Sequence, residues 1–317
     1  MKKYFTFYAH RKIFYMISLA IMIIGIIGVA VRGVHLDIQF TGGAILKYSY
    51  QGELDADAVA DKASEILGRL TSAQITKDLN TGENRVVLNL AGEYGMSSDE
   101  QAEFLAKLNE KFPTAQFVNA ESSLVQPFFG RRFLERSIFA VLLALALILV
   151  YEWITFRKIG GLLAGLAALV ALFHDLLVVF FTCVIAGIPI GDSFVAVALS
   201  IIGYSINDTI VVFDRIRENR RIHAKESLET IADLSVSQSM SRSINTNIAV
   251  TISVALIYFL AMRSSLDSVI SFALPMAIGS ISGCYSTLCL CGPLWVTWQK
   301  RREKKREDGR KPEPAKA

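Results

Sequence analysis

Six long apolar runs constrain the fold of this chain more than any other feature. A membrane-spanning helix needs roughly 20 apolar residues, and charged residues are rare in every run. The runs comprise residues 13–31, 137–156, 159–187, 193–214, 243–262 and 268–298. With 52% hydrophobic residues and a mean hydropathy of +0.41, the 317-residue chain is predicted to be a polytopic α-helical membrane protein with six transmembrane helices.

The ends of the first and last runs need separate arguments. The first run could be a cleaved signal peptide, but it exceeds the roughly 7–15 residues of a signal core and no small-residue cleavage site precedes Arg32. We therefore expect it to be retained as an anchor. In the last run, Pro275 and Pro293 are expected to break the helix near its two ends.

Basic residues predict the orientation of the chain. They precede the first run, separate the second from the third and the fourth from the fifth, and follow the sixth. By the positive-inside rule both termini are expected in the cytoplasm. The predicted parts are a cytoplasmic N-terminus with the first helix (1–31), an extracytoplasmic domain (32–135), helices two to six (136–299) and a basic cytoplasmic tail (300–317).

The external segment has the pattern of a small α/β domain. It carries ten basic and fifteen acidic residues. Strands are predicted at 45–50 and 85–90, and helices at 55–70 and from Ser97 or Ser98 to Phe112, where Pro113 ends the second helix. A strand, helix, strand, strand, helix, strand order predicts a ferredoxin-like sheet, which we interpret as a binding or structural module.

Nothing in the sequence indicates an enzyme. The phosphate-binding Gly-x-x-x-x-Gly-Lys loop, His-Glu-x-x-His and Gly-x-Ser-x-Gly are all missing. The four cysteines, Cys183, Cys284, Cys289 and Cys291, fall within apolar runs and are interpreted as small packing residues. We expect no catalytic residue, cofactor, metal or nucleic-acid partner. The basic tail is interpreted as a topology anchor, with a lipid or ribosome contact as the alternative.

Two carboxylates within the apolar runs are the candidate functional residues. Asp208 stands in an otherwise uncharged span, where an ionisable group costs on the order of 2.5–3.5 kcal/mol. A neutral Asn could make a helix contact without this cost, so Asp208 is predicted to carry protons. At a rise of about 1.5 Å per residue, Asp175 would lie about 24 Å from the inner face and Asp208 about 8 Å, at two levels of one route. Arg242 could extend from the inner face to meet Asp208.

The neighbouring residues admit simpler interpretations. Asp175 could be functional or structural. His174 is expected to be an ordinary helix–helix hydrogen-bonding residue, because adjacent residues on a helix point away from each other. The charged residues from Asp214 to Glu218 are expected to form a solvated cluster at the inner surface.

Three motifs resemble one known family. Gly-Tyr-Ser-Ile-Asn-Asp-Thr at 203–209, continued by Phe-Asp-Arg-Ile-Arg-Glu-Asn at 213–219, is similar to the signature of the SecF subunits of the SecD/SecF family. Ser-Arg-Ser-Ile-Asn-Thr-Asn at 241–247 and the His-Asp pair at 174–175 also match. Gln39 departs from the pattern, because the family has an Asp there. The residues that the resemblance implies as support for Asp208, Arg242 and Asp175 are Tyr204, Ser205, Asn207, Thr209 and Asn245.

The resemblance also implies a function and a set of partners. The family has the resistance-nodulation-division type of fold and pairs with SecD. It uses the proton gradient to complete the translocation of unfolded polypeptides through SecYEG after SecA has driven them, with YajC and membrane lipid as further contacts. The chain has no internal repeat of its 203–208 motif, so the other half of the fold is expected from another polypeptide. The alternatives are a small-molecule efflux subunit, which would need larger external domains, and a membrane sensor, which would not need Asp208.

Overall fold

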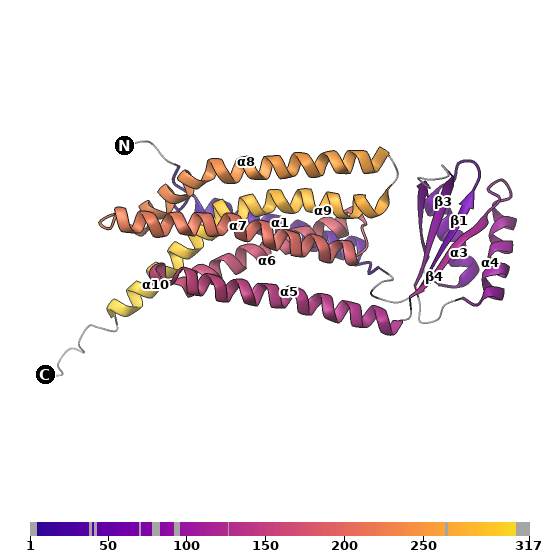
Figure 1. The fold of residues 1–317 in the computed structure, drawn as a ribbon, viewed down its shortest axis with the longest axis horizontal. Helices are drawn as coiled ribbons and strands as arrows, with labels where there is room; N and C mark the ends of the chain where they lie inside the picture. Colours follow the sequence, from indigo (N-terminus) through magenta and orange to yellow (C-terminus); the bar gives the residue numbers. More distant parts are fainter. Residues whose placement is uncertain are drawn as a thin grey trace.

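The computed structural model describes residues 5–37, 40, 43–69, 71–77, 83–91, 96–125, 127–263 and 266–308. It consists of a bundle of long helices with a small α/β domain at one end (Figure 1). The first and last described residues lie at the opposite end of the bundle (Figure 1). This architecture confirms the predicted fold class.

Six helices are long and apolar enough to cross a membrane. The sixth is composite, because a π-helical segment joins two α-helices into one continuous path. The helices are α1 (Arg11–Arg32), α5 (Pro127–Thr155), α6 (Gly161–Ala186), α7 (Asp192–Ile222), α8 (Leu228–Arg263) and the composite of α9 (Asp267–Tyr285), η2 (Ser286–Cys291) and α10 (Gly292–Asp308).

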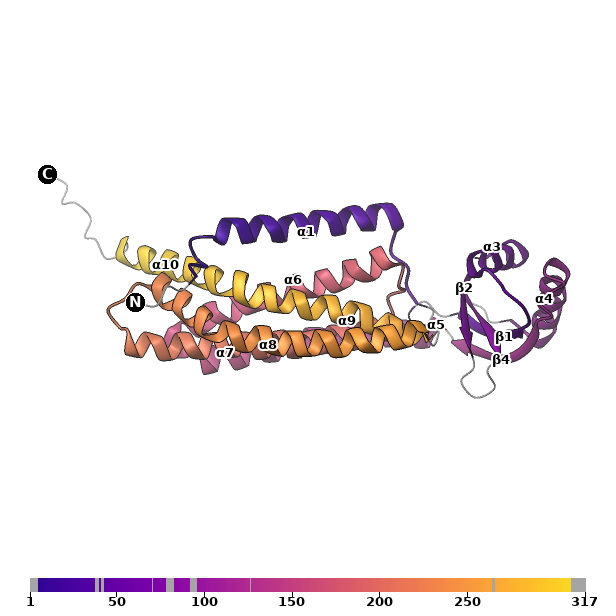
Figure 2. The ribbon, with the colours of Figure 1, turned by 90° about the horizontal axis from the view of Figure 1, so that it is seen from above.

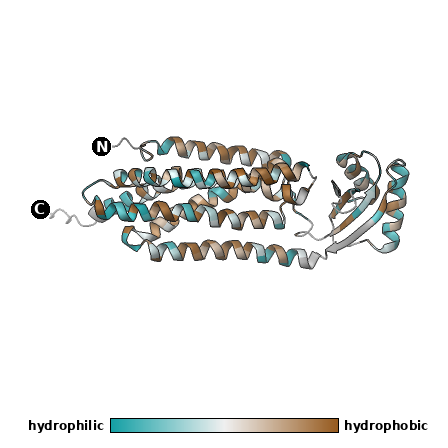
Figure 3. Ribbon diagram, turned by 45° about the horizontal axis from the view of Figure 1, so that its top comes forward, coloured by the Kyte–Doolittle hydropathy of each residue, from teal (hydrophilic) through white to brown (hydrophobic). Residues whose placement is uncertain are grey.

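Several helices continue beyond the apolar runs that identify them. Helix α7 extends to Ile222 and helix α8 begins at Leu228, whereas the apolar runs end at 214 and begin at 243. The 31 residues of α7 span about 46 Å, more than the ~30 Å hydrocarbon core. Figure 3 shows apolar residues along the bundle and polar residues toward the end with the chain termini. Hydropathy thus marks the part of a helix suited to lipid, while the helix itself extends further.

The expectation that two prolines break the last run was wrong. Pro275 lies inside α9, and Pro293 is the second residue of α10. Proline removes only one backbone donor, and neighbouring helices or hydroxyl side chains can satisfy the freed carbonyl in a membrane bundle. The irregular part is instead the π-helical segment η2, which begins eleven residues after Pro275.

Helix α6 is the interior helix of the bundle. It contacts α1, α5, α7 and α9, and 56% of its most apolar window is buried, against 6% for α1, α5 and α8. Small residues allow this close packing: a Cβ on Gly165 would lie 2.9 Å from Leu149 Cδ1 of α5. The outer helices α1, α5 and α8 therefore leave wide apolar faces for lipid or another chain.

The α/β domain is a four-stranded antiparallel sheet with the strand order β2-β3-β1-β4. Its helices α3 and α4 lie on one face of the sheet (Figures 1 and 2). The elements are β1 (Gly43–Tyr50), α3 (Ala56–Leu67), β2 (Thr71–Lys77), β3 (Asn84–Ala91), α4 (Ser98–Lys111) and β4 (Val118–Val125). The predicted ferredoxin-like order is confirmed.

Alternation along β1 explains which face of the sheet is covered. Leu46, Tyr48 and Tyr50 are buried with Phe104 and Leu108 of α4, while the residues between them are partly exposed. Burial raises the pKa of Tyr48 to about 12, so this side chain stays neutral in the core.

A short bridge joins the domain linker to the bundle. After α1, Leu36 pairs with Ile190 in the turn between α6 and α7, and the backbone N–H of Asp37 donates to the Ile190 carbonyl at 3.0 Å. A Cβ on Gly191 would lie 2.7 Å from the Asp37 Cβ, so the contact requires glycine at this position. The turn between two interior helices is therefore attached to the segment that leads into the domain.

We expect Ser97→Ala to weaken the start of α4. The Ser97 side chain accepts the Glu100 N–H, and the Glu100 carboxylate accepts the Ser97 N–H at 2.7 Å. Losing such a cap costs ~0.5–2 kcal/mol, which hydrogen exchange in the first turn of α4 would report as faster exchange. The Ser97 N–H lowers the pKa of Glu100, so the Glu100 half of this cap is present at neutral pH and is lost as the pH falls through the folded-state pKa. Unchanged exchange in Ser97→Ala would contradict this assignment.

Candidate functional site

Asp175 lies at the centre of the bundle and is fully buried, with 0% exposure. Three hydroxyl groups donate to its carboxylate. Ser205 of α7 and Ser286 of η2 donate to Oδ2 at 2.8 and 2.7 Å, and Ser282 of α9 donates to Oδ1 at 2.6 Å. A carboxylate accepts hydrogen bonds on both oxygens, so this arrangement holds it without a cation. Asp175 thereby connects three helices.

His174 also contacts Asp175, which corrects the expectation that the two side chains diverge. The His174 Nδ1 atom lies 3.3 Å from Asp175 Oδ1. Adjacent residues do point to different sides of a helix, but Nδ1 is close to the ring's point of attachment and reaches back to the neighbouring carboxylate. The His174 ring also lies beside the Tyr285 ring, with centroids 5.9 Å apart.

Asp208 lies on α7 with 6% exposure and accepts a hydrogen bond from α8. The Asn247 side-chain amide donates to Asp208 Oδ2 at 2.7 Å and to the Ser243 carbonyl at 3.0 Å. A cavity of about 10 Å³ lies against Asp208, Ser205 and Asn247. That volume is at the lower limit for one water molecule. The cavity can therefore hold at most one water molecule, which can carry a proton.

Asp175 and Asp208 lie at one level of the bundle, and we call these two acids and the hydroxyl side chains around them the polar layer. The prediction that the two carboxylates lie at separate levels was wrong. Ser205 donates to Asp175 and precedes Asp208 by less than one helical turn. The error came from placing the inner end of α7 at residue 214. Because α7 continues to Ile222, Asp208 lies 14 residues from that end, and Asp175 lies 14 residues from Gly161 at the start of α6. Both are about 21 Å from the same end of the bundle.

The π-helical segment supplies further hydroxyl groups to this layer. The Thr287 hydroxyl lies 3.1 Å from the Thr209 hydroxyl of α7, and it donates to the Ser205 carbonyl at 3.5 Å. Single-turn π-helices are rare and occur frequently at functional sites. The sequence analysis missed Ser282, Ser286 and Thr287 because hydroxyl residues do not interrupt an apolar run.

The structure brings some of the proposed supporting residues to the site and separates others. Ser205 and Thr209 are buried in the polar layer with both carboxylates. Tyr204, Asn207 and Asn245 are exposed on outer faces of α7 and α8. Asn247, two residues after Asn245, is the amide that binds Asp208. Gln39 lies outside the described residues.

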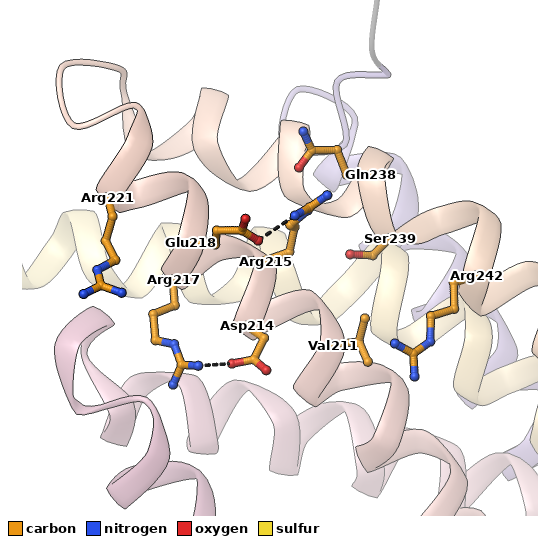
Figure 4. Close-up of a pocket in the computed structure, with 9 residues that line it drawn as sticks. All are labelled: Val211, Asp214, Arg215, Arg217, Glu218, Arg221, Gln238, Ser239 and Arg242. Atoms are coloured by element: carbon orange, nitrogen blue, oxygen red, sulfur yellow. Dashed lines mark hydrogen bonds and ion pairs between the residues drawn. The ribbon is translucent and has the colours of Figure 1, made fainter.

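Arg242 lines a polar pocket of about 540 Å³ between α7 and α8 (Figure 4). The two carboxylates of this pocket are already paired: Asp214 with Arg217 at 2.6 Å, and Glu218 with Arg215 at 2.5 Å. Among the described residues no ion pair within 4 Å involves Arg242, but its charge interacts with Asp208. The guanidinium therefore acts on Asp208 from the end of the bundle that carries the chain termini.

Comparisons with known proteins identify the family. The family described as "Protein export membrane protein SecD/SecF, C-terminal" matches residues 105–301. The chain is 31% identical to the protein translocase subunit SecF of Alicyclobacillus acidocaldarius, over 99% of both chains. It is 32% identical to that of Anaerolinea thermophila, over 91% of this chain and 92% of the relative.

Solved structures agree with this assignment. The crystal structure of SecDF from Thermus thermophilus, a translocon-associated membrane protein, has a TM-score of 0.77 at 26% identity and covers 95% of this chain. A SecDF structure in a super-membrane-facing form has a TM-score of 0.69 at 24% identity, which shows a similar fold. The chain spans only 39–40% of the length of these SecDF chains.

The protein is thus a polytopic membrane protein with buried carboxylates in its helical bundle and an α/β domain at one end of the bundle. It belongs to the SecD/SecF family of protein-export membrane proteins, and within that family its full length matches the subunits named SecF.

We expect Ser286→Ala to destabilise the bundle. The substitution removes one of the two donors to Asp175 Oδ2. Lost hydrogen bonds to charged groups cost ~1.5–3 kcal/mol, so the thermal unfolding midpoint in detergent should fall. Ser253→Ala is a matched control, because the exposed Ser253 hydroxyl bonds only its own helix, at the Ala249 carbonyl. Equal unfolding midpoints for the two variants would contradict the role of Ser286.

Proposed function

We propose that this chain pairs with a SecD-like subunit in the bacterial cytoplasmic membrane and couples proton movement to the export of polypeptides. The observation that carries the proposal is the pair of buried carboxylates, Asp175 and Asp208, with Ser205 donating to Asp175 from a position less than one helical turn before Asp208. Ionisable groups inside a membrane bundle mark proton or ion pathways. A purely structural contact would be met by neutral amides at lower cost.

Polar side chains exposed on the spanning helices support the need for a second subunit. Tyr204, Asn207 and Asn245 are polar and exposed on helices that span the membrane, where contact with lipid is costly. The SecDF chains are more than twice as long as this one. A SecD-like chain covering the exposed faces of α7 and α8 would shield these groups and complete the fold. SecYEG, SecA and YajC are then partners of the assembled pair.

The linker bridge offers a route from proton binding to domain movement. Protonation of Asp208 removes a charge that interacts with Arg242 and with the Asn247 amide, so α7 and α8 can change their packing. Helix α7 starts at the turn that binds the linker through Leu36 and Ile190. One elementary charge moving through 100 mV supplies about 2.3 kcal/mol, enough to shift a marginal packing equilibrium. A displaced domain would act on an emerging polypeptide.

The orientation follows the positive-inside rule, with both termini in the cytoplasm and the α/β domain outside. Protons would then enter from the domain side and leave at the end that carries Arg242. This direction matches the electrochemical gradient of respiring bacteria and makes the gradient, rather than nucleotide hydrolysis, the energy source for this subunit.

We expect Asp208→Asn to abolish the gradient-dependent part of export while leaving ATP-driven translocation intact. The amide keeps the size and polarity of the side chain but cannot take up a proton. The measurement is the rate of translocation into inverted vesicles with and without a proton gradient. Asp214→Asn is the matched control, because Asp214 is paired with Arg217 in the surface pocket, and it should be mild. Full gradient-driven export by Asp208→Asn would show that Asp208 only packs helices.

Two amide substitutions on α8 refine this test. Asn247→Ala removes the donor to Asp208 and should slow gradient-driven export. Asn245→Ala leaves that bond untouched and should affect export less. The reverse order would indicate that the Asn247 contact is not part of the coupling.

A further inference from the structure

Glu152 is a buried acid outside the polar layer, and its environment is unusual. It lies on α5, three residues before the helix ends at Thr155, toward the end of the bundle that carries the termini (Figure 1). Its exposure is 0%, and both carboxyl oxygens lack a hydrogen-bond partner among the described residues. Asp175 by contrast accepts three hydroxyl donors. An ionised carboxylate without partners is costly in an apolar interior, so a change of charge at Glu152 must be coupled to a proton.

The neighbours of Glu152 connect it to the polar layer. Where α5 packs against α6, the Glu152 Cβ lies 3.5 Å from the position that a Cβ on Gly165 would take. Glu152 therefore faces a glycine of α6. On the composite sixth helix, Cys291, the last residue of η2, interacts electrostatically with both Glu152 and Asp175. Arg217 of α7 is bonded to the Thr155 carbonyl and lies over the Phe156 ring. Thus η2 donates to Asp175 through Ser286 at its beginning, and at its end it carries Cys291, which interacts electrostatically with Glu152.

Two unsatisfied polar groups follow Cys291 along the sixth helix, toward the chain termini. Cys291, Trp295 and Gln299 recur every four residues and so share one face of the sixth helix. The Trp295 indole N–H and the Gln299 side-chain carbonyl are buried without partners among the described residues. Buried polar groups are nearly always satisfied, so the unsatisfied atoms of Glu152, Trp295 and Gln299 call for an explanation. The Gln299 amide N–H donates onward to Glu303 at 3.3 Å.

We propose that Glu152 is a proton-carrying residue in the half of the route nearest the termini, receiving protons from the Asp175 network past Cys291. The inference rests on the proposed function and adds a residue to it. In the step, an O–H bond at the Asp175 carboxyl breaks, the proton is relayed along η2, and an O–H bond forms at the Glu152 carboxylate. The transfer is not direct, because Gly165, which faces Glu152, lies ten residues before Asp175 on α6, about 15 Å away. Glu152 then releases this proton along the Trp295–Gln299 face to the aqueous side. Charge passes from one buried carboxyl to the other, and neither oxidant nor reductant is involved.

The first test is the rate of gradient-driven export by the assembled subunit pair carrying Glu152→Gln. We expect a loss of at least about tenfold, because proton transfer by a positioned group contributes about that much or more. ATP-driven translocation should be unchanged. Glu135→Gln is the matched control, an identical substitution on the same helix at an exposed residue paired with Arg131, and it should export normally. Normal gradient-driven export by Glu152→Gln would overturn the proposal.

The second test separates proton carrying from packing and needs no mutant to fold. Dicyclohexylcarbodiimide, an apolar reagent, modifies protonated carboxyls in membrane interiors, and mass spectrometry locates the adduct. In the wild-type pair, the adduct at Glu152 should decrease as the pH rises and change when a proton gradient is imposed. A structural acid would also titrate with pH, but its adduct yield at constant pH would not respond to the proton gradient, and that result would overturn the proposal.

The proposed function and the role of Glu152 can be disproved separately. If Asp208→Asn abolishes gradient-driven export and Glu152→Gln does not, the proposed function stands and Glu152 is excluded from the route. If Asp208→Asn exports normally, the proton-coupled function itself is wrong. Glu152→Met gives a further check, since an apolar side chain of similar length that exported normally would show that Glu152 only fills space.

Discussion

The carboxylate of Asp175 and its three hydroxyl donors hold the interior of this bundle together. Ser205, Ser282 and Ser286 come from α7, α9 and η2, so one buried acid joins three elements around α6. Hydroxyl donors give a carboxylate full hydrogen bonding without a permanent ion pair. Such a carboxylate can gain or lose a proton, or exchange hydrogen-bond partners, without leaving a buried cation unpaired. The acid of a buried salt bridge cannot, because its protonation leaves the cation without a partner.

This constraint also explains the irregular sixth helix. The π-helical turn directs Ser286 to Asp175 and Thr287 to Thr209 and the Ser205 carbonyl within two successive residues. It ends at Cys291, near Glu152. At the other end of the bundle, the turn between α6 and α7 binds the linker of the α/β domain. The turn that links the two helices carrying the acids is thus attached to the segment that leads into the α/β domain.

Much of this fold can be predicted from hydropathy and alternation alone. Apolar runs locate the six spans, and the strand and helix periods of residues 43–125 indicate the ferredoxin-like sheet, because burial imposes those periods on the sequence. Asp208 is also evident, since a charge in an apolar run is conspicuous. Helix ends are not evident, because α7 continues as a polar helix after it leaves the apolar run, and this placed Asp208 and Asp175 at different levels.

The rest of the site depends on which helix faces meet, and a single sequence does not specify that. Ser282 and Ser286 are ordinary residues of an apolar helix until Asp175 faces them. Asn245 and Asn247 belong to the same motif, yet only the second reaches Asp208. Glu152 resembles a membrane-edge residue by position, and only packing against α6 shows it to be fully buried.

The central claim is that Asp175 and Asp208 act as one polar network through Ser205. Isotope-edited infrared spectroscopy of the assembled pair can follow the protonation of Asp175 as the pH is changed. If the network exists, Asp208→Asn must shift the titration of Asp175, and Ser205→Ala must reduce that shift. A titration of Asp175 that is the same in the wild type and in Asp208→Asn would contradict the account.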